Sequence, residues 1–351
     1  MTWLYEILGV PFGYVLKFLY ETVALQNYAL AIILLTLFAR ILMIPTSISQ
    51  QKGMAKTQRM QAKLRKIQTK YAGNQQKIQE ETTALYQREG YNPMGAGCAP
   101  MLVQFLLLFG LIGAIYYPLS HSFGFDEAVI KDLALAMRQV PELSSLVEGK
   151  KITDFNQEIY IIGSISKGNL TFEFLSSLVE AGKIKITSDL AVLESAITEI
   201  SKIDFKLFGL ALGDVPWIDG IYRDEAGKMT GINFKLWIVP VLSFLSTMAT
   251  GLYSQMKQKK TNPAAANNAM MTGCMTFGMP LFSLYWVINY PIGIGVYWIA
   301  SSVFGFISTV IIGNIYSPKK VMAKLMVDET VERRSKENSI KLAAEIKEKK
   351  N

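Results

Sequence analysis

The 351-residue sequence is poor in the side chains that metal sites, disulfides and acid–base catalysis require. It contains one histidine, His121, and two cysteines, Cys98 and Cys274, which lie far apart in apolar surroundings. We therefore expect no disulfide framework, no metal site and no bound cofactor. Acidic residues are also absent from every long apolar segment, which argues against catalysis by carboxylates inside a membrane.

Apolar residues are abundant: they make up 50% of the chain, and the mean hydropathy is positive. This composition is typical of membrane proteins. A helix needs about 20 mostly apolar residues to cross the hydrocarbon core of a bilayer. Five segments meet this condition, so we predict an all-α integral membrane protein with five transmembrane helices. The predicted spans cover residues 26–49, 96–119, 234–257, 269–288 and 291–313.

The segments between the spans differ in character. Residues 1–25 are aromatic and amphipathic, which indicates a helix lying in the headgroup layer on the outer face. Residues 50–95 predict a cytoplasmic helical hairpin, because Met60, Leu64, Ile67 and Tyr71 recur at helical spacing and the break at residues 73–74 follows them. Residues 120–233 form a long hydrophilic insert, for which we expect helices near 126–140, 170–181 and 190–200.

The distribution of charge predicts the orientation, because lysine and arginine in short loops mark the cytoplasmic side. The hairpin carries nine basic and three acidic residues, and the 258–268 loop with Lys257 carries three basic residues and no acidic one. The tail, residues 314–351, carries ten basic and six acidic residues, whereas the insert carries eleven and seventeen. We therefore expect the N-terminus outside, the insert outside and the C-terminus in the cytoplasm.

Arg40 lies within the first predicted span, about eight residues or roughly 12 Å from its cytoplasmic end. A guanidinium in a bilayer costs from about 2.5 to more than 10 kcal/mol, and no span offers a carboxylate partner. Water reaching Arg40 through a hydrophilic groove open to the cytoplasm would lower that cost. The alternative is an arginine that extends its side chain toward the helix end.

Polar side chains on other predicted spans support the groove. Ser243, Thr247, Thr250 and Ser254 share one face of the third span, and Thr36 lies one turn from Arg40. Gln104 enters the second span at a similar depth, and Tyr297, Ser301 and Ser308 share a face of the fifth. The alternative is that such hydroxyls bond carbonyls of their own helix or allow close helix packing.

Several linked motifs resemble the YidC/Oxa family of membrane protein insertases, in particular its short, five-helix, Gram-positive-like bacterial type. The segment LTLFARILMIP at residues 35–45 resembles the first core helix with its groove arginine. The hairpin at 60–71 and 79–81, YNPMG at 91–95 with PMLVQ at 100–104, and NYPIG at 289–293 with VYW at 296–298 follow in the family's order. The insert at 120–233 is longer than the outer loop of short relatives.

This resemblance implies a bacterial plasma- or inner-membrane insertase and chaperone that works without nucleotide hydrolysis, alone or with the Sec translocon. It implies as partners nascent membrane proteins and the lipid bilayer. The basic residues of the tail and of the cytoplasmic loops predict contact with the phosphates of ribosomal RNA, and we expect no binding to DNA. The tail could equally bind anionic lipid. The expected substrate-binding groove comprises Arg40, Thr36, Gln104, Ser243, Thr247, Thr250, Gln255, Tyr297 and Trp298, with no catalytic residue.

The sequence leaves two other functions open. A polytopic transporter of a small solute is the first alternative, but ion-coupled carriers place carboxylates or histidine in their spans, and these spans have none. An intramembrane enzyme is the second, but Ser120 and His121 are adjacent in sequence at the outer edge and form no nucleophile–base pair by themselves. We therefore expect a protein that is not an enzyme.

Overall fold

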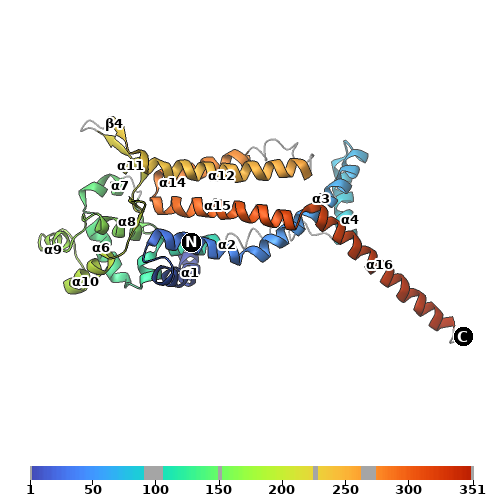
Figure 1. Ribbon diagram of the computed structural model, residues 1–351, viewed down its shortest axis with the longest axis horizontal. Coiled ribbons are helices and arrows are strands. Elements are labelled where there is room, and N and C mark those ends of the chain that lie inside the picture. Colours follow the sequence, from blue (N-terminus) through green and yellow to red (C-terminus); the bar gives the residue numbers. More distant parts are fainter. Residues whose placement is uncertain (1, 91–105, 149–151, 224–227, 262–273, 349–351) are drawn as a thin grey trace. The chain divides into compact units, whose positions relative to one another are not determined.

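The computed structural model describes residues 2–90, 106–148, 152–223, 228–261 and 274–348, and most of them are helical (Figure 1). The chain divides into two compact units. One comprises Met1–Leu42 and Gln104–Phe306, and the other comprises Met43–Val103 and Ile307–Asn351.

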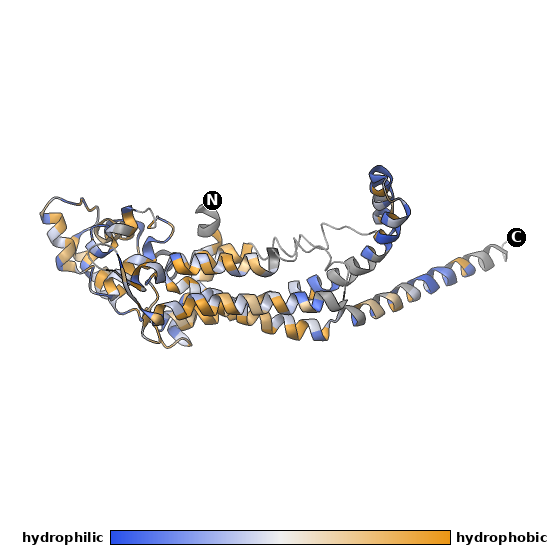
Figure 2. Ribbon diagram, turned by 90° about the horizontal axis from the view of Figure 1, so that it is seen from above, coloured by the Kyte–Doolittle hydropathy of each residue, from blue (hydrophilic) through white to orange (hydrophobic). Residues whose placement is uncertain are grey.

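Two described helices are long and apolar enough to cross a membrane: α12 (Phe234–Thr261), and the run that begins with α15 (Ile292–Ile315). A third span results if α2 (Tyr28–Leu42) and the first part of α3 are taken as one. Orange, apolar residues dominate these helices, whereas blue, hydrophilic residues dominate the helical hairpin (Figure 2). The membrane character is therefore supported, and the arrangement of five spans stays a prediction.

The first predicted span, residues 26–49, is interrupted at Met43. Helix α2 ends at Leu42, and α3 (Ile44–Lys70) begins directly after Met43. Pro45 lies in the first turn of α3, where its missing N–H leaves no helical hydrogen bond unmade. Inside a continuous helix the same ring would clash with the carbonyl four residues earlier, so a break here is the expected consequence of Pro45.

Two predicted spans lie partly outside the described residues. Of residues 96–119, the structure describes the apolar helix Leu106–Tyr116, which η1 (Pro118–Phe123), a π-helical turn, follows. Of residues 269–288, it describes η4 (Cys274–Gly278) and α14 (Met279–Asn289), which packs along α12. Helix α14 is thus one residue longer at its C-terminal end than predicted.

The N-terminal helix α1 (Thr2–Thr22) packs against α2 and η1. Gly9 and Gly13 allow this approach, since a Cβ atom at Gly9 would lie 2.7 Å from Nδ1 of His121 and one at Gly13 would lie 2.5 Å from its carbonyl oxygen. Ile7, Tyr14 and Phe18 are exposed on the same helix. One side of α1 therefore packs against the rest of the unit and another presents apolar side chains, and the position of α1 in the headgroup layer stays a prediction.

The insert is a small helical assembly with two short β-hairpins. The helices expected near 126–140, 170–181 and 190–200 are present as α6 (Glu127–Met137), α9 (Phe172–Glu180) and α10 (Leu190–Ser201). The sequence reading did not foresee α8 (Gln157–Ser166), whose residues from Glu158 to Ile165 are all buried. The remaining elements are η2 (Pro141–Leu143), α7 (Ser144–Glu148), α11 (Pro216–Asp219), and the antiparallel pairs β1 (Lys206–Leu207) with β2 (Leu210–Ala211) and β3 (Ile221–Arg223) with β4 (Met229–Ile232).

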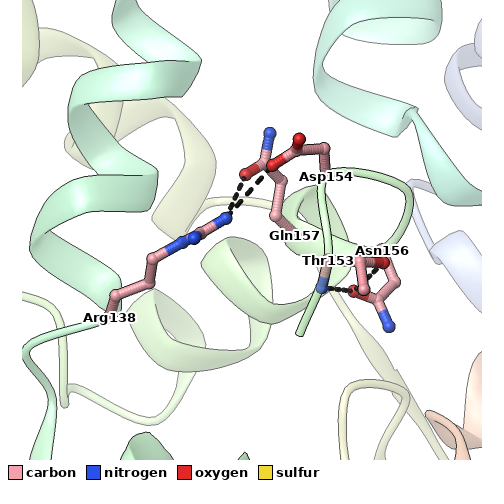
Figure 3. A network of polar contacts seen from close by, with 5 residues as sticks. All are labelled: Arg138, Thr153, Asp154, Asn156 and Gln157. Atoms are coloured by element: carbon pink, nitrogen blue, oxygen red, sulfur yellow. Dashed lines mark hydrogen bonds and ion pairs between the residues drawn. The ribbon is translucent and has the colours of Figure 1, made fainter. Parts of the chain in front are cut away.

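A polar network joins α6 to the start of α8 (Figure 3). Arg138, which follows α6, donates from Nη2 to Oδ1 of Asp154 at 3.2 Å and to Oε1 of Gln157 at 3.4 Å. Asn156 accepts from the backbone N–H of Thr153 at 2.8 Å. These bonds fix the loop that leads into α8.

The insert also hydrogen-bonds the first turns of two apolar helices. The N–H of Tyr28, at the start of α2, donates to the carbonyl of Asp204 at 3.0 Å. At the start of α15, the N–H groups of Ile292 and Gly293 donate to the carbonyls of Asp214 at 2.8 Å and Leu212 at 2.9 Å. The first N–H groups of a helix have no acceptor within the helix, and here carbonyl groups of the insert accept from them.

The second unit contains the predicted hairpin, which starts earlier than residue 50 because α3 begins at Ile44. Gly73 adopts φ +90°, and Asn74 caps α4 (Gln75–Arg88) by accepting from the N–H of Lys77. Lys63 pairs with Glu89, and the hydroxyl of Tyr71 donates to Glu81 at 3.3 Å. Because the paired residues approach each other in sequence toward the turn, α3 and α4 run antiparallel, as predicted.

Helix α16 (Pro318–Glu348), which forms most of the tail, packs against α3 within the same unit. The ammonium group of Lys52 lies 5.9 Å from the ring centroid of Tyr316, just before α16. Residues 91–95 of the predicted hairpin segment lie outside the described residues.

Candidate functional site: an arginine among apolar helices

The guanidinium of Arg40 connects α2 with α15. Its Nη2 atom donates to the carbonyl of Ser301 at 2.9 Å and to the hydroxyl of Ser301 at 2.5 Å. Arg40 therefore does have polar partners, but both are neutral. A neutral carbonyl and hydroxyl solvate a positive charge without cancelling it, so the charge stays available to a further negative group.

Gly305 makes room for the guanidinium one turn further along α15. A Cβ atom at Gly305 would lie 3.3 Å from Cζ and from Nη2 of Arg40, which is tighter than ordinary van der Waals contact. Tyr297, one turn before Ser301 on the same face of α15, is 7% exposed. Tyr297, Ser301 and Gly305 thus form the part of α15 that faces Arg40.

The predicted threonines bond their own helices. Thr36 is buried and donates to the carbonyl of Ile32 at 2.7 Å. Thr247 donates to the carbonyl of Ser243 at 2.8 Å, and Thr250 to that of Ser246 at 2.9 Å. All three hydroxyls thus make the bond to a carbonyl of their own helix, and their place in a groove stays a prediction.

Thr247 also reaches a second helix. Its Oγ1 atom lies 3.2 Å from Oγ of Ser302, so α12 and α15 share a hydroxyl contact. Ser301 and Ser302 are adjacent, and together they connect α15 to both α2 and α12. Ser243 is fully buried, and its hydroxyl has no hydrogen-bond partner among the described residues.

The other predicted site residues lie elsewhere. Trp298 is partly buried, with its ring centroid 6.4 Å from that of Phe282 on α14 and 6.5 Å from that of Tyr297. Gln255 is partly buried near the end of α12. Gln104 lies outside the described residues. The structure thus brings Arg40, Tyr297 and Thr247 to one stretch of α15, and sequence reasoning missed Ser302 and Gly305 there.

This arrangement suits electrostatic attraction more than covalent chemistry. In the part of the chain that the structure describes, His, Cys, Asp and Glu side chains form no group of three that could hold a metal ion. A single fixed positive charge among hydroxyls can attract an anionic or strongly polar group into otherwise apolar surroundings.

A buried carboxyl lies in the insert of the same unit. Glu158 on α8 accepts from the N–H groups of Leu119 at 2.7 Å and Ser120 at 3.1 Å, and from the Ser120 hydroxyl at 2.8 Å. Burial raises the pKa of the Glu158 carboxyl from an ordinary 4.5 to about 7, although the hydrogen bonds oppose this shift. Glu158 thus holds the first turn of η1 against the core of the insert.

The family described as 60Kd inner membrane protein matches residues 18–166 and 171–320 of the chain. The "Membrane protein insertase YidC" of Syntrophus aciditrophicus is 39% identical over 119 residues, which are 34% of this chain and 21% of that protein. A protein of the same name from Oceanobacillus iheyensis is 45% identical over 94 residues, or 26% of this chain and 37% of the relative.

The "Membrane protein insertase MisCA" of Bacillus subtilis is 36% identical over 132 residues, which cover 36% of this chain and 50% of that protein. The chain thus spans between about a fifth and a half of the length of these three curated relatives.

Proposed function

Because the chain belongs to the 60Kd inner membrane protein family, we propose that it inserts newly made proteins into a bacterial membrane. The names of the similar proteins from Syntrophus aciditrophicus and Bacillus subtilis, both called membrane protein insertases, support this function. Two or three described helices suited to crossing a membrane agree with it.

The observation that carries the mechanism is the position of Arg40. Arg40 lies on the apolar helix α2, and its side chain hydrogen-bonds the neutral Ser301 on α15. We propose that Arg40, Tyr297, Thr247 and the neighbouring polar residues line a hydrophilic groove open to the cytoplasm. Thr36, Ser243, Thr250, Gln255, Trp298 and Gln104 complete the proposed groove.

In this mechanism the substrate arrives from the cytoplasm as a helical hairpin with a polar or acidic outer segment. Arg40 attracts that segment into the groove, which shortens the hydrocarbon thickness it has to cross. The apolar helix of the substrate meanwhile passes into lipid, and the transfer of its apolar surface drives the reaction. The groove lowers a barrier and supplies no net free energy, so no nucleotide is consumed.

The charge distribution supports an N-terminus outside and a C-terminus in the cytoplasm. In this orientation the hairpin and α16 face the ribosome, and their basic residues could contact ribosomal RNA phosphates or anionic lipid. We propose that the protein inserts its substrates either alone or together with the Sec translocon. A transporter is less well supported, because the predicted spans carry no carboxylate or histidine for ion coupling.

The test is an insertion assay with protease protection in membranes that depend on this protein. Arg40→Ala should lose insertion of substrates with acidic outer segments. Attraction across roughly 4 Å is worth about 4 kcal/mol at intermediate dielectric, and it requires both charges. Neutral versions of the same substrates should therefore depend less on Arg40.

Arg40→Lys should keep much of the activity, because only Nη2 of Arg40 makes the contacts with Ser301 and an ammonium can reproduce them. Arg138→Ala is the matched control, since it removes an arginine that pairs in the insert with the largely exposed Asp154. Equal insertion of acidic substrates by Arg40→Ala and the parent, at matched expression, would refute the charge mechanism.

A further inference from the structure

The three non-glycine residues with positive φ in the described chain lie at one place. Leu25 has φ 51° and Gln26 has φ 58°, and they directly precede Asn27 at the start of α2. Phe208 has φ 50° and lies in the turn between β1 and β2. Asn27 donates to the carbonyl of Lys206 at 2.9 Å, so the strained segments adjoin each other.

Phe208 is an unusual choice for its position. Leu207 pairs with Leu210, so Phe208 and Gly209 form a two-residue hairpin loop, and both have positive φ. Such type I′ turns favour Asn-Gly, because asparagine tolerates the left-handed conformation and a bulky side chain does not. Backbone strain of this kind persists mainly where the side chain has a role.

Leu25 and Phe208 share a second cost, which is exposure to solvent. Phe208 is 97% exposed and Leu25 is 85% exposed, and these are the two most exposed large apolar side chains of those the structure describes. Two strained and exposed apolar residues at one site mark a surface that contacts something apolar.

The place of this surface in the fold identifies the partner. The apolar helix α2 begins at Tyr28, so Asn27 lies at the membrane boundary. Asn27 contacts Lys206, and Phe208 is two residues further along the chain. The Cα atom of Phe208 is therefore no more than about 7 Å from the Cα atom of Lys206. The headgroup layer on each side of the hydrocarbon is itself roughly 5–7 Å thick. Phe208 and Leu25 consequently lie within its reach.

We propose that Leu25 and Phe208 anchor the insert in the lipid headgroup layer at the outer end of α2. Exposed Phe and Leu side chains bury favourably at the boundary between the headgroups and the acyl chains. The exposed Lys202, which precedes the hairpin, and the exposed Lys206, in β1, can contact lipid phosphates. The partner is the lipid surface itself, and the anchor fixes the height of the insert above the bilayer. This proposal requires that α2 spans the membrane, and it does not depend on the insertase activity.

The first experiment places a fluorescent label at Phe208→Cys in the full chain, with Cys98 and Cys274 replaced by serine. The protein is reconstituted into phosphatidylcholine–phosphatidylglycerol vesicles, and the label is quenched by headgroup nitroxide lipid or by aqueous iodide. Lipid quenching should exceed that of a label at Val192→Cys roughly twofold, because interfacial anchors sit at headgroup depth. Val192 is the matched control: it is 47% exposed on α10, which packs against α6, α8 and α9.

The second experiment separates the anchor from the fold. Phe208→Asn places the preferred residue in the turn, so the thermal stability in detergent should be unchanged or higher. A label at Leu25→Cys should lose lipid quenching when Phe208→Asn is added. Iodide quenching at Phe208→Cys equal to that at Val192→Cys, with no lipid quenching, would overturn the proposal. So would crosslinking of two copies through residue 208, since the partner would then be protein.

Discussion

At the scale of single residues, the contact between Arg40 and α15 depends on the space above Gly305. We expect Gly305→Ala to weaken insertion of substrates with acidic outer segments, because its Cβ would crowd the guanidinium at 3.3 Å. The same change should leave thermal stability equal or higher, since alanine favours a helix over glycine by up to about 1 kcal/mol. Insertion assays and thermal unfolding, measured on the same preparations, check both expectations.

Gly293 on the same helix provides the control for this substitution. A Cβ atom at Gly293 would meet Leu212 at 3.6 Å, which is an ordinary contact. Gly293→Ala should therefore leave insertion unchanged. If both glycine variants insert acidic substrates as well as the parent does, the position of Arg40 against α15 is unimportant for the activity.

Glu158 gives a pH dependence to the stability of the first unit. Its pKa is about 7 in the folded protein and 4.5 in an unfolded chain, so folding favours the protonated form. The contribution of Glu158 to stability is therefore complete below about pH 4.5 and is lost as the pH rises through 7. The loss over that window is about 3 kcal/mol.

Glu158→Gln should remove this pH dependence and raise the unfolding temperature at pH 8, because an amide oxygen can still accept from Leu119 and Ser120. Thermal unfolding in detergent at pH 5 and pH 8 measures the effect. Glu142→Gln, at an exposed carboxyl of η2, should behave like the parent. A parent protein that is more stable at pH 8 than Glu158→Gln would show that folding favours the ionised carboxylate, which contradicts a raised pKa of Glu158.

At the scale of elements, the sequence predicted α12 and α15 because their apolar runs are long enough to need a membrane. It predicted α6, α9 and α10 because each has one apolar face. It could not predict α8, whose buried stretch from Glu158 to Ile165 is enclosed on all sides and shows no helical periodicity. The break at Met43 was foreseeable from Pro45, but the apolar run concealed it.

In the candidate site, too, the sequence predicted some residues and not others. Arg40 stood out because a charge within an apolar segment needs a reason to be there. Whether Thr36 bonds its own helix or faces a groove depends on the rotamer of one side chain, which no pattern specifies. Ser302 was missed because it lies about 100° around the helix from Ser301, and only the positions of α2 and α12 show that both faces are used.

The hairpin of α3 and α4 allows a test of its pairing. Lys63→Glu should open the hairpin, since it places two negative charges together with Glu89, and hydrogen exchange in α4 should become faster. Adding Glu89→Lys should restore the parent rate. The effect should not exceed about 1 kcal/mol, because both side chains are partly exposed.

Lys66→Glu makes the same change of charge at an exposed position on α3 and serves as the control. If it speeds exchange in α4 as much as Lys63→Glu does, net charge and not the pairing with Glu89 controls the hairpin.

At the scale of the whole molecule, the insert has two parts with different structural roles: residues 204–214 and the helices from α6 to α10. Residues 204–214 supply carbonyls to the first N–H groups of α2 and α15, and Phe205 and Leu212 in this stretch are 1% and 0% exposed. An unsatisfied N–H group at a membrane boundary is costly, so this stretch belongs to the apolar helices as much as to the insert. Helix α8 approaches this stretch, since a Cβ atom at Gly213 would lie 3.1 Å from the Cα atom of Gly163.

Replacing residues 122–202 with a Gly/Ser linker should therefore lower thermal stability, because it uncovers Phe205 and removes Glu158 from the N–H groups of Leu119 and Ser120. Insertion of a single-span substrate should nevertheless persist at matched protein levels, since the residues around Arg40 are untouched. Replacing residues 204–214 with a linker of equal length should instead prevent accumulation of the protein, because α2 and α15 lose their partners. Near-total loss of insertion by the first variant, at normal protein levels, would mean that α6 to α10 act directly on substrates.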